Sequence, residues 1–163
     1  LRAVFKGIPF QMCHVHMERI VIKGTTKKPI LEAGKVLLAL VKTLHQGISS
    51  EEFKGYLNKY LEKYRDFLNE KTANEITGET FFTHEPLRKA ALSLIHFLPY
   101  LFTFEQNKSI PRTTNSLEGH FSHIRDVMRI HRGLKRKQAE KVLNSIFLAS
   151  TIAPSKKKLK HIL

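Results

Sequence analysis

The sequence predicts a mainly α-helical chain with one short strand near its N-terminus. Two observations carry this prediction. Apolar residues recur at helical spacing over most of the chain, and only one short apolar run lacks a helical period. The length of 163 residues, of which 42% are hydrophobic, is enough for one packed domain or for part of one.

The strand is predicted over residues 8–13, with the sequence IPFQMC. This run is apolar and too short for a helix, so we expect a strand that ends near Cys13. One or two helical turns are expected over residues 16–23, and Gly24 with the two threonines that follow it should end them.

Three longer helices are predicted in the middle of the chain. Pro29 opens the first and Gly47 ends it. Ser49 and Glu52 have the spacing of a capping box at the start of the second. Pro86 opens the third, which is apolar around most of its circumference and should be buried. The apolar positions of the three helices are, in order, Ile30, Ala33, Leu37, Leu40, Val41 and Leu44; Phe53, Leu57, Tyr60, Leu61, Tyr64, Phe67 and Leu68; Leu87, Ala90, Ala91, Leu94, Ile95, Leu98, Leu101 and Phe102.

Two closing helices are predicted after a loop. Residues 72–83 have no periodicity and should connect the second and third of the earlier helices. Residues 113–116 are four helix N-cap types in a row, and Gly133 ends the helix that follows them. The last helix is expected over residues 135–150. In the first closing helix we expect an apolar stripe that is exposed unless the preceding helices fold over it, made of Leu117, Phe121, Ile124 and Met128.

The charge of the chain indicates a polyanionic partner. The formal net charge is +14, from 28 basic and 14 acidic side chains. Residues 1–43 hold 8 basic and 2 acidic side chains, residues 44–104 hold 7 and 8, and residues 105–163 hold 13 and 4. The two ends are therefore basic and the middle is neutral. For a chain expected to be soluble and cytoplasmic, nucleic acid is a better partner than a membrane.

Composition also excludes several classes. One cysteine excludes a disulfide scaffold. The longest apolar run is too short to span a bilayer. The sequence contains no P-loop, no dinucleotide-binding glycine motif, no nucleophile elbow and no zinc-protease motif.

A basic set near the C-terminus is predicted to contact phosphates. Exposed helix faces normally mix charges of both signs, but here Asp126 alone interrupts the cations. Nothing in the set indicates base-specific contacts. Its members are Arg112, Arg125, Arg129, Arg132, Lys135, Arg136 and Lys137.

Glu118 is the candidate catalytic carboxylate, and two uses of it are open. Asn115 and Glu118 have capping-box spacing, so the glutamate can serve as a helix cap. The alternative is a Mg²⁺ ligand in a phosphate-processing site. Such a site needs several carboxylates, so Glu118 alone cannot form it.

Cys13 and His16 are a possible half of a zinc site, which His120 and His123 could complete. The alternative is a buried cysteine beside a partly buried histidine, because a single Cys-x-x-His pair is a weak signal. A Cys13–His16 nucleophile pair has no third group placed by the sequence.

Several segments resemble the transposases of the Mutator-type bacterial insertion-sequence superfamily. The resemblance lies in QMCHVH at residues 11–16, TH at 83–84, LPYLFT at 98–103, TTNSLEG at 113–119 and RIHRGL at 129–134. These segments occur in collinear order over nearly the whole chain, and TTNSLEG is the most specific of them.

The resemblance implies a ribonuclease-H-like α/β catalytic domain with an all-helical insertion. In that family two aspartates and a glutamate bind Mg²⁺ or Mn²⁺ and drive DNA strand cleavage and transfer during transposition. By resemblance Glu118 is the third acid, and Cys13 with His16 is a family signature pair. The implied organisation is a strand and turn of the core over residues 1–28, the insertion over 29–104, closing helices over 105–152 and a basic tail over 153–163.

The sequence also departs from the family pattern. The family's two aspartates precede the Cys-x-x-His pair, whereas the only aspartates here, Asp66 and Asp126, follow it. We therefore expect the C-terminal part of a transposase, either a natural truncation or an excised fragment, inactive alone. Its expected partner is duplex DNA at transposon ends and target sites, and further candidate partners are a second copy of the chain or intact transposase. Its expected location is the bacterial cytoplasm, in association with the nucleoid.

Two other functions fit the same residues. One is a non-catalytic basic helical module that binds DNA and regulates intact transposase. The other is a module stabilised by zinc.

Overall fold

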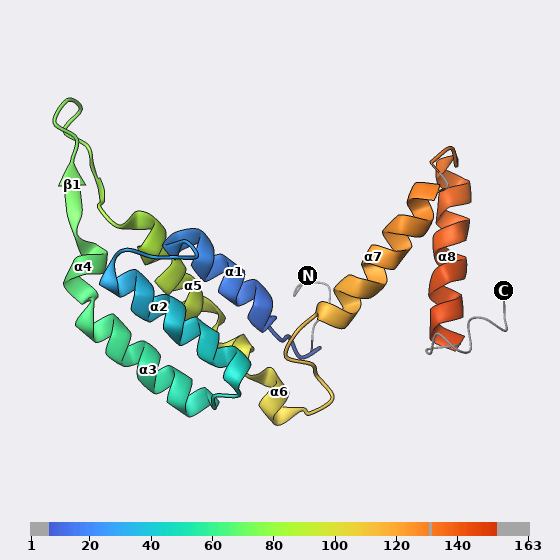
Figure 1. The fold of residues 1–163 in the computed structure, drawn as a ribbon, viewed down its shortest axis with the longest axis horizontal. Helices are drawn as coiled ribbons and strands as arrows, with labels where there is room; N and C mark the ends of the chain where they lie inside the picture. Colours follow the sequence, from blue (N-terminus) through green and yellow to red (C-terminus); the bar gives the residue numbers. More distant parts are fainter. Residues whose placement is uncertain (1–6, 131, 153–163) are drawn as a thin grey trace. The chain divides into compact units, whose positions relative to one another are not determined.

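The computed structural model describes residues 7–130 and 132–152 of the chain. These fall into two compact units, Leu1–Thr114 and Asn115–Leu163. Both are built mainly from helices, which confirms the predicted mainly α class (Figure 1). The predicted basic tail over residues 153–163 lies outside the described residues.

The first unit contains most of the elements. In chain order they are α1 (His14–Thr25), α2 (Glu32–Lys42), a 3₁₀ turn (Thr43–Gln46), α3 (Ser50–Lys63), α4 (Arg65–Asn69), β1 (Lys71–Ala73), β2 (Thr80–Phe82), α5 (Glu85–Leu101) and α6 (Thr103–Gln106).

The core of the first unit lies where α1, α2, α3 and α5 pack together. Helix α1 lies along α5, and Gly24 packs against Pro86 and Ala90 of α5. A Cβ at Gly24 would come within 2.7 Å of the Ala90 Cβ and would also collide with the Pro86 carbonyl oxygen. The fully buried side chains of this core include Met17, Val21, Leu37, Val41, Leu44, Phe53, Leu57, Leu94 and Leu101.

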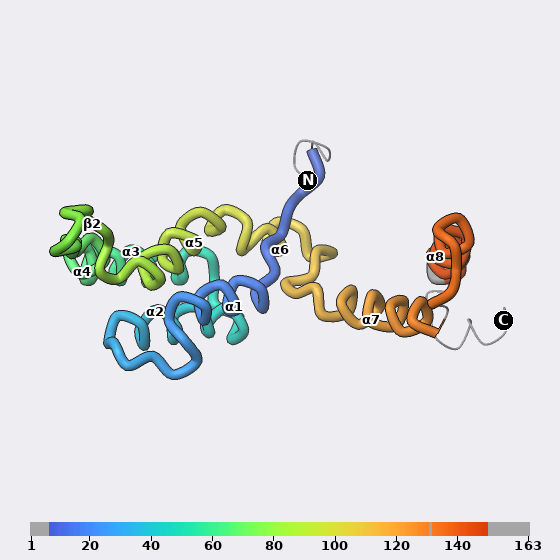
Figure 2. The backbone as a smooth tube through the Cα atoms, turned by 90° about the horizontal axis from the view of Figure 1, so that it is seen from above, coloured from blue at the N-terminus to red at the C-terminus, as the bar shows by residue number. Residues whose placement is uncertain are grey.

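The strand predicted over residues 8–13 is wrong. Residues 8–12 form no regular element, and Cys13 is the N-cap of α1. The segment is held at the end of α5, where the Met12 amide donates to the Tyr100 carbonyl at 2.7 Å and the Gln11 side-chain amide donates to the Leu101 carbonyl at 2.7 Å. Individual contacts to a helix end therefore satisfy its polar groups, and no strand ladder is needed. Figure 2 shows this N-terminal segment running toward the end of α5 near α6.

Helix α1 is longer than predicted, because it begins directly after Cys13 and runs for 12 residues. The capping box of α3 is confirmed. The Glu52 amide donates to the Ser49 hydroxyl, and the Ser49 amide donates to the Glu52 carboxylate. The Ser49 hydroxyl also donates to the Glu52 carboxylate at 2.7 Å, and the two hydrogen bonds from the Ser49 hydroxyl and amide lower the pKa of Glu52. Gly47, predicted to end the preceding helix, adopts a left-handed conformation with φ of 84°, which glycine tolerates without strain.

The connection predicted over residues 72–83 contains an antiparallel hairpin. Strands β1 and β2 pair Lys71 with Phe82 and Ala73 with Thr80. Figure 1 shows the hairpin extending away from the helices of its unit. The pairing is only three residues long on each strand, which explains why no alternating pattern marks it in the sequence.

The second unit pairs α7 (Asn115–Ile130) with α8 (Arg136–Ile152). The predicted apolar stripe of α7 is exposed only in part. Leu117 and Phe121 are 50% and 45% exposed, whereas Ile124 is buried and Met128 is half-buried. Phe147 and Leu148 of α8 are also exposed.

Candidate functional site

Glu118 lies in the first turn of α7 and is half-buried. The helix begins at Asn115, one residue earlier than a capping box with Asn115 as N-cap requires. A carboxylate at this end of a helix is stabilised by the helix dipole. The first-turn position is compatible with either the cap or the metal ligand, and both uses of Glu118 stay predictions.

Six of the seven residues predicted to contact phosphates lie in the second unit, and all six are exposed: Arg125, Arg129, Arg132, Lys135, Arg136 and Lys137. Residues 115–152 hold seven basic and three acidic side chains. Two of the cations form exposed ion pairs within their own helices, Arg129 with Asp126 at 3.7 Å and Arg136 with Glu140 at 3.0 Å. Such pairs contribute only about 0–1 kcal/mol, so they leave these cations available for phosphates.

Arg112, the seventh residue predicted to contact phosphates, lies in the first unit. Its guanidinium carbon is 4.8 Å from the centroid of the Phe104 ring, a cation–π contact. Its backbone carbonyl accepts a hydrogen bond from the His14 amide at 3.1 Å. Arg112 therefore also has a structural role at the start of α1.

Cys13 is 6% exposed, and its Sγ accepts hydrogen bonds from the Thr114 amide at 3.4 Å and the Thr114 hydroxyl at 3.5 Å. Burial raises the pKa of the thiol. Hydrogen bonds with Thr114 and with the backbone and side chain of His16 lower it by more than burial raises it, so the pKa is about 7. A substantial fraction of Cys13 is therefore thiolate at neutral pH. The thiolate is the form that binds metals or attacks electrophiles, and here it is shielded from solvent.

His14 is a buried histidine that was not predicted as a site residue. Its Nδ1 is 3.1 Å from the Leu44 carbonyl oxygen and its Nε2 is 2.7 Å from the Leu101 carbonyl oxygen. Burial lowers the pKa of His14, the two carbonyls oppose this, and the charges of His45 and Arg112 add to the lowering. A neutral imidazole has one N–H, so only one of the two carbonyls receives a hydrogen bond.

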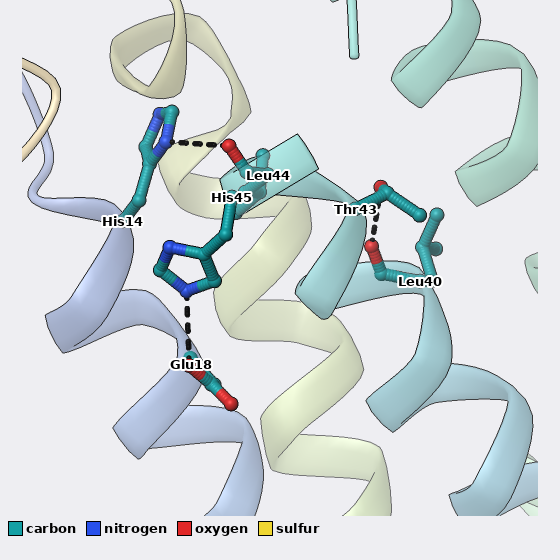
Figure 3. Close-up of polar contacts among 6 residues, drawn as sticks. All are labelled: His14, Glu18, Leu40, Thr43, Leu44 and His45. Carbon is teal, nitrogen blue, oxygen red and sulfur yellow. Dashed lines mark hydrogen bonds and ion pairs between the residues drawn. The ribbon is translucent and has the colours of Figure 1, made fainter. Parts of the chain in front are cut away.

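Figure 3 shows His14 beside a second polar contact, in which His45 Nε2 lies 2.9 Å from the Glu18 carboxylate. This contact links α1 to the 3₁₀ turn that follows α2. His14 thus joins α1 to both the 3₁₀ turn and the end of α5. Its position in the Cys-x-x-His run is visible in the sequence, but its burial depends on carbonyls 30 and 87 residues away.

The described residues contain no group of three or more His, Cys, Asp or Glu side chains that could hold a metal ion. Cys13 and His16 lie at the start of α1, whereas His120 and His123 belong to the second unit, so the four-residue zinc site stays a prediction. Since magnesium sites use several oxygen ligands, Glu118 and the other described residues do not form one by themselves.

Comparisons with protein-family models, with curated proteins and with solved structures gave no significant match. Among the described residues, no helix combines the length and the apolarity needed to cross a membrane.

Proposed function

We propose that this chain supplies DNA binding and one metal-binding carboxylate to a DDE transposase with a ribonuclease-H-like catalytic domain. The DNA-binding part rests on one observation, the exposed cations of α7 and α8 with few acids among them. Cations of this kind bind phosphates irrespective of base sequence. The catalytic part is supported by the resemblance of residues 11–16 and 113–119 to Mutator-type transposases.

In this proposal Glu118 is one ligand of Mg²⁺ or Mn²⁺. The other carboxylates have to come from aspartates that precede the Cys-x-x-His pair in the family, which this sequence does not contain. The chain alone should therefore bind transposon ends or target DNA without cleaving them. A bacterial, nucleoid-associated location belongs to the same proposal.

A non-catalytic DNA-binding module is the second candidate. It is favoured by the lack of a metal-binding cluster among the described residues, because phosphate binding needs no metal. Such a module would occupy transposon ends or pair with intact transposase.

The purified chain, mixed with supercoiled plasmid and Mg²⁺ or Mn²⁺, tests the proposal. We expect retarded plasmid on a gel and no conversion to nicked circles. Glu118→Gln should bind at least as well, because it removes a negative charge near the DNA-binding cations. Nicking by the wild-type chain that disappears in Glu118→Gln would show that the chain is a complete nuclease and would overturn the proposal.

A further inference from the structure

An apolar groove of about 430 Å³ lies between α2 and α3 in the first unit. Its only charged lining residues among the described part of the chain are two lysines, Lys59 and Lys63. Tyr56 at its edge is 54% exposed. The groove is thus apolar with a positively charged rim. Its remaining lining residues are Val36, Ala39, Leu40, Thr43, Tyr60 and Tyr64.

The two lysines of the groove have no carboxylate partner among the described ion pairs. The Lys59 ammonium lies 5.9 Å from the centroid of the Tyr56 ring, and the Lys63 ammonium lies 5.1 Å from that of Tyr64. The lysines are four positions apart on α3, so they are about one helical turn from each other. The groove therefore suits an occupant with an apolar side chain flanked by two acids.

The tip of the β1–β2 hairpin has this composition. Ile76 is 95% exposed, and Glu75 and Glu79 stand on either side of it in the turn. Neither carboxylate has an ion-pair partner among the residues that the structure describes. Single exposed apolar residues are common on protein surfaces, but here the isoleucine and its flanking acids match the groove in both polarity and charge.

The turn that carries Ile76 is ordered by its own hydrogen bonds. The Asn74 side-chain oxygen accepts from the amides of Ile76 at 2.9 Å and Thr77 at 3.2 Å. The Gly78 amide donates to the Asn74 carbonyl at 2.8 Å, with Gly78 in a left-handed conformation that glycine adopts without strain. A pre-organised tip loses little entropy when it docks, which favours binding.

We propose that the hairpin tip of one copy docks into the α2–α3 groove of a second copy. Ile76 fills the apolar part of the groove, while Glu75 and Glu79 pair with Lys59 and Lys63. The hairpin extends away from the helices of its own unit, so its tip is presented to a neighbouring molecule (Figure 1). Because each copy has one tip and one groove, reciprocal docking closes a two-fold dimer. This proposal does not depend on DNA binding or on Glu118.

Sedimentation velocity with paired charge reversals tests this dimer. The groove variant Lys59→Glu/Lys63→Glu and the tip variant Glu75→Lys/Glu79→Lys should each be monomeric, because tip and groove then carry like charges. Mixed together, they should form a heterodimer, since each tip again meets a groove of opposite charge. Misfolded variants would not regain a dimer on mixing, so recovery of the heterodimer separates loss of the interface from loss of the fold. Far-ultraviolet circular dichroism checks that each variant keeps its helix content.

Ile76→Asp tests the apolar anchor. Because Ile76 is almost fully exposed, this change should leave the fold intact and weaken dimerisation about tenfold or more. Lys27→Glu/Lys28→Glu, at two exposed positions before α2, makes the same charge change as the groove variant and should leave the dimer unaffected. The proposal is overturned by a wild-type chain that stays monomeric at every concentration, by a dimer insensitive to Ile76→Asp, or by tip and groove variants that do not associate when mixed.

Discussion

Two neighbouring residues, Cys13 and His14, have pKa values shifted from their ordinary values, and the sequence around them does not predict these shifts. Cys13 has a pKa lowered to about 7 because Thr114 and His16 hydrogen-bond the thiolate. His14 has its pKa lowered because it is buried. Both shifts favour the form that the folded environment accommodates, a hydrogen-bonded thiolate and an uncharged imidazole. The folded structure, rather than the Cys-x-x-His spacing, determines the state of each group.

His14 should make stability fall in mild acid. Its pKa is lower in the folded state, so the unfolded chain takes up the proton first as the pH falls. The stabilisation from neutral His14 is complete above the ordinary histidine pKa and is lost as the pH falls from about 7 toward 5. Urea unfolding across this range should show a smaller decrease in the free energy of unfolding for His14→Gln than for wild type.

His96→Gln changes an exposed histidine of α5 and serves as the matched control. His14→Gln also weakens a buried contact, so its absolute stability should be lower at every pH. The informative quantity is therefore how steeply the free energy of unfolding changes with pH, rather than its absolute value. If the free energy of unfolding of His14→Gln changed with pH as steeply as that of wild type, the protonation of His14 would not differ between the folded and unfolded states, which would contradict the prediction.

Among the elements, those defined by local signals could be predicted from the sequence. The capping box of Ser49 and Glu52 and the stop at Gly47 depend on residues a few positions apart. The segment over residues 8–13 could not be predicted, because its partners lie some 90 positions away at the end of α5. The short hairpin after α4 was missed because its turn, rather than a strand pattern, defines it.

Gly24 illustrates the same limit of local signals. Helix α1 ends at Thr25, as Gly24 and the two threonines that follow it predict, but the sequence does not show that Gly24 also lies at the contact with α5. Of the candidate site residues, the exposed cations of α7 and α8 could be predicted from their spacing. The buried His14 could not, since only tertiary packing brings it to the Leu44 and Leu101 carbonyls.

Gly24→Ala should destabilise the first unit. The added Cβ would collide with the Pro86 carbonyl and the Ala90 side chain, so α1 and α5 must separate. Overpacking of this kind costs about 1–3 kcal/mol. The control is Gly55→Ala on α3, where a Cβ meets nothing within 4 Å; it should raise stability by about 0.5–1 kcal/mol because alanine favours helix. Equal effects of the two substitutions in urea unfolding would contradict the close packing of α1 on α5.

Over the whole molecule, the net charge of +14 is divided unevenly between the two units. The first unit holds the neutral middle of the chain, a well-packed core and the hairpin with its exposed acids. The second unit is a helix pair with many exposed cations and few acids. This division assigns packing and the proposed self-association to the first unit, and the proposed phosphate binding mainly to the second.

The central claim is that the cations of α7 and α8 bind duplex DNA. Fluorescence anisotropy of a labelled duplex, titrated with the chain at several salt concentrations, tests it most directly. Affinity should fall steeply with salt, and Arg125→Ala/Arg129→Ala should reduce the magnitude of the log–log slope by about 1–2, because each lost phosphate contact changes it by about 0.9. Lys54→Ala/Lys89→Ala, which removes the same charge from the neutral middle, should leave the slope near the wild-type value. No binding at low salt, or the same loss of slope in both double variants, would contradict the claim.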